Sequence, residues 1–130
     1  DIELPESARA LGQLGAELIL VTNGNMDPYG PVHRTAIMAR AQENQAFAVM
    51  VNRVGDGDEG LVFAGGSAAI DPFGRTLFEA GRTECRQVVE LDLDLLRTVR
   101  RDYDYLSDRR LLLIGEQIEH SDGRRELLIP

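Results

Sequence analysis

The sequence predicts an α/β fold, because segments with helical apolar spacing alternate with short apolar strands along its first half. The chain has 130 residues of which 43% are hydrophobic, enough for one buried core, so a disordered chain is not expected. In the second half, strand-like runs are joined by turns, which is typical of an antiparallel meander. Together these observations favour a sheet covered by helices.

The first helix is expected to begin at Pro5, a residue that suits the first helical turn. Ala8 and Leu11 then fall on one face, and Gly15 supplies a stop. The next apolar run, residues 17–23, is too short for a helix. It predicts a strand that is buried on both faces.

A second helix is expected from Pro31 to near Gln45, because small apolar residues recur on one of its faces. Residues 46–54 predict a second buried strand, and residues 24–31 have the composition of a turn. The later elements are predicted as strands over residues 61–71, 75–81 and 86–93, a helix over residues 93–103, and a polar tail to residue 130.

Charge and composition exclude several classes of partner. All 14 positive charges are arginines, and 22 acidic residues leave a net charge of −8, which repels phosphate backbones, so we expect no nucleic acid partner. No apolar run approaches the roughly 18 residues that span a bilayer, and the chain does not open on a signal peptide. We therefore expect a cytoplasmic protein that contacts no membrane and needs no cofactor.

One glycine-rich stretch has the spacing of a dinucleotide-binding motif. Residues 55–60 read GDGDEG, but a pyrophosphate would meet the carboxylates of Asp56, Asp58 and Glu59. The following residues indicate a strand rather than the helix whose N-terminus would hold a phosphate. The ligand spacing of a calcium loop is absent as well, so a solvated acidic turn is favoured.

Isolated reactive residues do not combine into a site. His33 has no metal ligand at helical spacing, and His120 has one carboxylate, Glu116, so no metal is expected. Cys85 is the single cysteine and has no nearby histidine, which favours a surface or interface thiol. Ser67 lacks the following glycine of a nucleophile elbow.

Arg40 and Glu43 are the strongest local signal. They lie three positions apart on the second helix, so they can form a solvated pair that contributes little to stability. Alternatively, the apolar face buries this helix and Arg40 must find a carboxylate, for which Glu6 or Asp1 is available. The sequence leaves both possibilities open.

Several segments together resemble the C-terminal half of the nitrilase superfamily, the carbon-nitrogen hydrolases. They are DIELPE, GAELILVTN, RAQENQAFAVMVNRVG, FAGGSAAIDPFGRTL, EAGRTE and VVELDLDLLRTVRRDY. The resemblance covers residues 1–106 and implies part of a four-layer α-β-β-α sandwich. It also suggests that residues 107–130 form a tail that contacts another subunit of a homo-oligomer.

The resemblance implies a Glu-Lys-Cys catalytic set that acts on amides or nitriles through a thioester. In the family the nucleophilic Cys stands in a C-Y-D stretch. By this register the Cys would lie two positions before Asp1. The Lys and the first Glu would also lie outside this chain. We therefore expect no catalytic residue within residues 1–130, no activity from this chain alone, and the N-terminal half as its partner.

The family pattern also indicates residues that contact the substrate or support the site. Support beneath the nucleophile is expected from Asp1, Glu6, Arg40 and Glu43, with Arg40 pairing to Glu6 or Asp1. A turn of ordinary composition competes with a substrate loop over residues 22–29. The expected substrate-binding residues are Asn23, Asn25, Met26, Asp27 and Tyr29.

Polar residues in that loop favour an amide over a nitrile as substrate. One alternative is a catalytically inactive nitrilase-like binding or scaffold domain, and another is an unrelated small α/β domain that binds a small ligand. Half of a sandwich would expose an apolar sheet face, so association is expected under the first two hypotheses.

Overall fold

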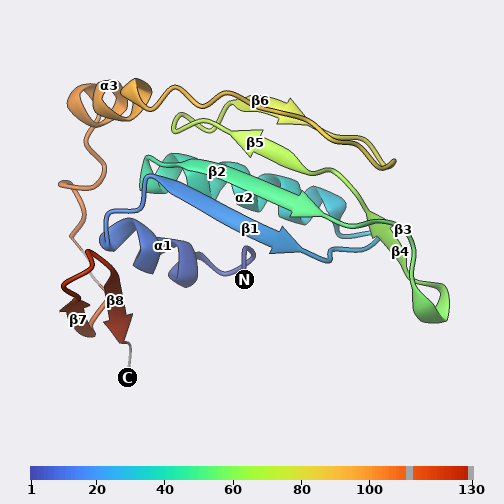
Figure 1. Cartoon of the computed structure of the whole chain (residues 1–130), viewed down its shortest axis with the longest axis horizontal. Helices are drawn as coiled ribbons and strands as arrows, with labels where there is room; N and C mark the ends of the chain where they lie inside the picture. The colour runs from blue at the N-terminus through green and yellow to red at the C-terminus, as the bar shows by residue number, and fades with distance from the viewer. Residues whose placement is uncertain (111–112, 129–130) are drawn as a thin grey trace.

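The computed structural model describes residues 1–110 and 113–128, and it places a layer of helices against one face of a sheet (Figure 1). The elements are α1 (Pro5–Gln13), β1 (Leu18–Asn23), α2 (Gly30–Asn44), β2 (Phe47–Asn52), β3 (Val54–Asp56), the 3-10 turn η1 (Asp58–Gly60), β4 (Val62–Ala64), β5 (Ala68–Ile70), β6 (Thr76–Glu79), α3 (Asp94–Asp102), β7 (Glu116–Glu119) and β8 (Arg125–Leu128). The four-stranded sheet has the order β1-β2-β5-β6. Its first pair is parallel and its other two pairs are antiparallel.

The predicted α/β class and both predicted helices of the first half are confirmed. Pro5 is the first residue of α1, as its fixed backbone favours. Helix α2 ends at Gln45, which takes a left-handed conformation with φ of 47° and turns the chain into β2. Within residues 1–110 and 113–128, no helix is long and apolar enough to cross a membrane.

The core lies between the helices and one face of the sheet. Ile37 and Ala41 of α2 are fully buried against Ala48 of β2 and Ile70 of β5. Alanines at these positions let the helix approach the strands closely, and α1 adds Ala8 to the same cluster. This arrangement fixes α1, α2 and the first two strands relative to one another.

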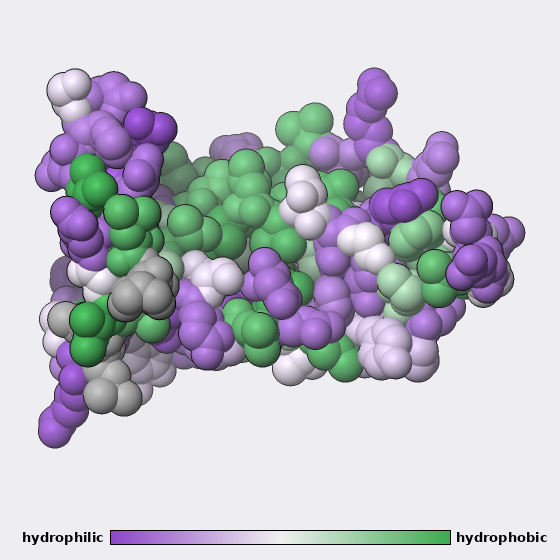
Figure 2. All heavy atoms as spheres, turned by 90° about the horizontal axis from the view of Figure 1, so that it is seen from below, coloured by the Kyte–Doolittle hydropathy of each residue, from purple (hydrophilic) through white to green (hydrophobic). Residues whose placement is uncertain are grey.

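The opposite face of the sheet is apolar and uncovered. Side chains of β1 alternate between the two faces, so the prediction of a strand buried on both faces is wrong for β1. Leu20 is 71% exposed and Val51 of β2 is 61% exposed, because both helices of the first half lie on the other side. Figure 2 shows hydrophobic side chains gathered along the middle of the molecule. The sheet thus has the exposed apolar face that half of a sandwich implies.

The second half departs from the predicted strands at two places. The strand predicted over residues 61–71 is divided into β4 and β5, because Gly65 and Gly66 take φ of 64° and 70° and turn the backbone. Residues 86–93, all of which the structure describes, form no strand. They run back along β6 toward α3 without a pairing partner (Figure 1). Alternation of apolar and polar residues is not sufficient to form a strand, because a strand also needs a neighbouring strand to pair with.

The tail forms a hairpin of its own. Strands β7 and β8 pair in antiparallel fashion, and Arg125 donates from Nη1 to the carbonyl oxygen of Leu14 over 2.9 Å. The Gln13 side chain of α1 accepts a hydrogen bond from the Leu113 amide over 3.2 Å. The described part of the tail therefore packs on α1 of the same chain. Its contact with another subunit stays a prediction.

Candidate functional site

The segment Asp1–Glu3 is held in place by Arg40, which lies on α2 and is 8% exposed. Its guanidinium donates from Nε to the Ile2 carbonyl oxygen over 3.2 Å and from Nη2 to the Glu3 carbonyl oxygen over 3.3 Å. Its Nη1 donates to Oε1 of Glu43 over 2.6 Å. Arg40 therefore pairs with Glu43, as one alternative predicted, but it does so while buried, as the other predicted.

The prediction that Arg40 pairs with Glu6 or Asp1 is wrong. The guanidinium reaches main-chain carbonyl groups instead, because Ile2 packs into the core and brings the backbone next to α2. Asp1 accepts a hydrogen bond from the Glu3 amide at Oδ1, over 2.9 Å. Glu6 is exposed in the first turn of α1 and forms no ion pair with any described residue.

Glu43 also fixes α1 to α2. Its Oε2 lies 3.7 Å from Nη2 of Arg9, and Arg9 donates from Nη1 to the Glu43 main-chain oxygen over 2.9 Å. The Glu43 carboxylate thus accepts a hydrogen bond from Arg40 on its own helix and forms an ion pair with Arg9 on α1. Through Glu43, Arg9 of α1 and Arg40 of α2 are held close to each other beside the N-terminal segment.

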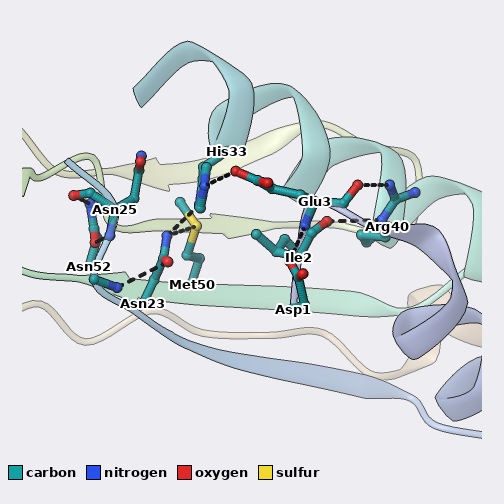
Figure 3. A network of polar contacts seen from close by, with 10 residues as sticks. Asp1, Ile2, Glu3, Asn23, Asn25, His33, Arg40, Met50 and Asn52 are labelled. Atoms are coloured by element: carbon teal, nitrogen blue, oxygen red, sulfur yellow. Dashed lines mark hydrogen bonds and ion pairs between the residues drawn. The ribbon is translucent and has the colours of Figure 1, made fainter. Parts of the chain in front are cut away.

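Asn23, at the end of β1, has an amide group that is already occupied. Its Nδ2 lies 2.8 Å from Nδ1 of His33 and 3.3 Å from the Met50 sulfur, while its Oδ1 accepts from the Gly24 amide over 3.0 Å (Figure 3). Its side chain lies on the helix-covered face, where it orders the start of the loop.

Asn25 differs from Asn23, because its main chain is held by hydrogen bonds while its side-chain amide is not. It is 6% exposed, and its main chain is held on both sides by Asn52, whose Oδ1 accepts from the Asn25 amide over 2.8 Å. The Nδ2 of Asn52 donates to the Asn25 carbonyl oxygen over 3.2 Å and to that of Gly65 over 2.7 Å. Yet the Asn25 side-chain amide forms no hydrogen bond with residues 1–110 or 113–128. Its main chain is thus held in place, while its side-chain amide has no partner in that range.

The rest of the loop is anchored to its surroundings. Met26 forms an isolated bridge with Phe63 of β4, and the Asp27 amide donates to the Val62 carbonyl oxygen over 2.9 Å. The Arg82 guanidinium donates to both carboxylate oxygens of Asp27 and holds the pKa of that carboxyl below its usual range. Tyr29 closes a turn onto Met26 and leaves its side chain exposed.

A hollow of about 360 Å³ opens beside Asn25. Its wall is charge-balanced, because Arg34 donates to Glu79 over 2.9 Å and Arg82 is paired with Asp27. A neutral polar ligand suits such a wall better than an ion, since each charge already has its partner. Residues that line the hollow include Asn25, Gly30, Pro31, Arg34, Glu79 and Arg82.

The other residues that the sequence analysis considered do not form a catalytic or metal-binding group among the described residues. Residues 55–60 run from the end of β3 through η1, at the tip of the β3–β4 hairpin, and lead into a strand, as the acidic-turn interpretation expected. Ser67 accepts a hydrogen bond from the Asn52 amide over 2.9 Å, and Cys85 is exposed after β6. Among residues 1–110 and 113–128, no group of three His, Cys, Asp or Glu side chains is placed to hold a metal ion.

Sequence reasoning missed two residues that organise the loop. Ligand spacing gives His33 no role in binding a metal, but in the structure its ring contacts both Glu3 and Asn23. Asn52 ends β2, within the predicted strand, and its side chain bonds to the main chains of Asn25 and Gly65, which the sequence pattern does not indicate. An asparagine that ends a buried strand was the available signal, because a buried amide needs partners.

Comparisons with known proteins agree on one family. The carbon-nitrogen hydrolase family model matches residues 1–101. The chain is 81% identical over 129 residues to an (R)-stereoselective amidase from Pseudomonas sp, covering 99% of this chain and 47% of that protein.

Two solved structures are similar in sequence and in fold. The carbon-nitrogen hydrolase from Helicobacter pylori G27 is 27% identical with a TM-score of 0.76, over 85% of this chain and 43% of that one. A mutant of the amidase from Nesterenkonia sp. AN1, in complex with butyramide, is 37% identical with a TM-score of 0.68. That match covers 85% of this chain and 38% of the amidase, so the chain spans less than half the length of each of these proteins.

Proposed function

This chain belongs to the carbon-nitrogen hydrolase family, and from that premise we propose that it forms one part of an enzyme that hydrolyses amides. The observation that carries the proposal is the hold of buried Arg40 on the Ile2 and Glu3 carbonyl groups. By family resemblance this segment directly follows the nucleophilic cysteine. A rigid hold there serves catalysis, because the thiol must meet the substrate in a fixed geometry.

The proposed reaction proceeds through a thioester. The thiolate attacks the amide carbonyl carbon, the C–N bond breaks, and the nitrogen leaves as ammonia after it gains a proton. Water then attacks the thioester, which releases the carboxylic acid and restores the thiol. In this proposal the Cys, the Lys and the first Glu lie outside residues 1–130, and this chain supplies the support and one wall of the pocket.

Asn25 is proposed to bind the substrate amide. Its side-chain carbonyl group can accept from the amide N–H, and its NH₂ group can donate to an oxygen of the substrate. A nitrile nitrogen can only accept, so it uses half of that capacity. The neutral wall of the hollow also suits an uncharged carboxamide. By similarity to the (R)-stereoselective amidase, we propose a chiral primary amide with preference for the R enantiomer.

The uncovered face of the sheet is proposed to meet the rest of the enzyme. Leu20 and Val51 stand on that face, and a second sheet packed on it would complete the four layers that the resemblance implies. Such a contact would bury apolar area that a lone soluble domain rarely exposes. A catalytically inactive scaffold would use the same face, so activity has to separate the two alternatives.

An ammonia-release assay tests the proposed function. The protein that contains this chain and the preceding region would be incubated with butyramide, with each enantiomer of 2-methylbutyramide, and with butyronitrile. We expect ammonia from the amides, faster release from the R than from the S enantiomer, and none from the nitrile. A folded protein that releases no ammonia from any amide would establish the inactive scaffold instead.

A further inference from the structure

His33 joins two parts of the candidate site that are distant in sequence. It lies in the first turn of α2, and its side chain is 12% exposed. Its Nε2 is 2.8 Å from Oε1 of Glu3, and its Nδ1 is 2.8 Å from Nδ2 of Asn23 (Figure 3). One imidazole ring therefore bridges the N-terminal segment and the start of the loop after β1.

The hydrogen-bond partners fix where the proton of this ring lies. The Oδ1 of Asn23 accepts from the Gly24 amide, so the amide nitrogen of Asn23 must face His33. That nitrogen carries hydrogens, so Nδ1 of His33 accepts. The hydrogen then sits on Nε2 and is donated to Glu3. With the hydrogen on Nε2, both ring nitrogens of His33 and both polar atoms of the Asn23 amide have a partner.

The same face of α2 holds the N-terminal segment at two points. His33 and Arg40 are seven positions apart, which is about two helical turns, so they project from one side of the helix. Arg40 holds the main chain of Ile2 and Glu3, and His33 holds the Glu3 side chain. In addition, His33 reaches the opposite way to Asn23, which Arg40 does not.

We propose that His33 is a positioning residue that sets the nucleophile segment and the substrate loop relative to each other. This inference rests on the proposed amide hydrolysis. Through Glu3 the ring fixes the segment that follows the nucleophile, and through Asn23 it fixes the backbone of Gly24 that leads to Asn25. The ring touches no substrate in this role. It acts by keeping two groups of contacts in register.

Two substitutions separate the two halves of the bridge. In His33→Asn, the short side chain places an oxygen near the position of Nδ1, so it keeps the acceptor for Asn23 and loses the donor to Glu3. In His33→Gln, the longer side chain places an NH₂ group near the position of Nε2, so it keeps the donor to Glu3 and loses the acceptor. Each variant thus cuts one contact of the pair.

The two variants should affect different kinetic constants. We expect His33→Asn to lower kcat for amide hydrolysis about tenfold with KM little changed, because the nucleophile segment loosens. We expect His33→Gln to raise KM about tenfold with kcat little changed, because the substrate loop loosens. A residue with a merely structural role would lower the melting temperature in both variants without this division.

A matched control is available in the tail. The Nε2 of His120 lies 3.2 Å from Oε1 of Glu126, far along the chain from the candidate site, and His120→Gln should leave kcat and KM within twofold. The proposal would be overturned if both His33 variants had the melting temperature, kcat and KM of the parent protein.

A spectroscopic readout keeps the inference independent of the reaction. If the parent protein hydrolyses no amide, the proposed function fails, and the bridge is read from NMR signals instead. The ring ¹⁵N shifts should report a hydrogen on Nε2, His33→Asn should move the Glu3 amide signal, and His33→Gln should move that of Gly24. A ring with its hydrogen on Nδ1, or shifts at neither amide, would overturn it.

Discussion

Arg40→Ala is expected to lose about 2–4 kcal/mol of folding free energy and roughly 100-fold in kcat/KM for amide hydrolysis. The substitution removes the 2.6 Å contact between Arg40 and the Glu43 carboxylate and both donors to the Ile2 and Glu3 carbonyl groups. Glu43 is 28% exposed and keeps Arg9 beside it, so most of the cost comes from the two main-chain carbonyl groups that lose their donors. Urea unfolding and steady-state kinetics measure the two effects.

Two control variants isolate the cause. Arg97→Ala removes a pair of the same i,i+3 spacing, with Asp94, but both side chains are well exposed, so about 0.5 kcal/mol or less is expected. Arg40→Lys keeps the charge beside Glu43 and loses the fork that reaches two carbonyl groups, so an intermediate loss is expected. If Arg40→Ala changed the folding free energy and kcat/KM as little as Arg97→Ala, the site would not depend on the hydrogen bonds of Arg40 to the Ile2 and Glu3 carbonyl groups.

A double substitution of the open sheet face should disrupt the assembled enzyme. In Leu20→Asp combined with Val51→Asp, both carboxylates stand on the face that the proposal covers with another sheet. Burying an unpaired carboxylate costs several kcal/mol, so we expect loss of the assembled state and activity reduced by more than about 1,000-fold. Native mass and ammonia release together report the outcome.

Val88→Asp is the matched control for the open face. Val88 is even more exposed than Leu20, but it lies outside the sheet, on the segment between β6 and α3. One added carboxylate there should change neither assembly nor activity by more than about twofold. Normal assembly and activity in the double variant would mean that nothing covers the face.

Local signals predicted the helices and the first strands well. Pro5 and the left-handed turn at Gln45 act within a few residues, and the apolar period of α2 reports which side it buries. Such signals are contained in the sequence of each element. The α/β class followed from their order along the chain.

Contacts between distant segments were harder to predict. The apolar run of β1 reads the same whether its second face is covered by this chain or by another, so its one-sided exposure was missed. The strand expected over residues 86–93 needed a neighbour that local alternation cannot specify.

Within the site, the partners were hidden for a similar reason. Arg40 bonds to main-chain oxygens, which every residue carries, so no side-chain pattern marks them. The spacing of residues around His33 on its own helix reveals nothing of its partners, because they come from the N-terminal segment and from β1. Residues that organise a loop through its backbone leave little trace in the sequence.

The most direct test of this account is to locate the acyl group during turnover. The protein that contains this chain would be quenched with acid while it hydrolyses a primary amide, then digested and analysed by mass spectrometry. We expect the acyl adduct on a cysteine that precedes Asp1, with Cys85 unmodified, because Cys85 is exposed beyond β6 and away from the segment that Arg40 holds. An adduct on Cys85 would contradict the account, since the nucleophile would then lie within residues 1–130.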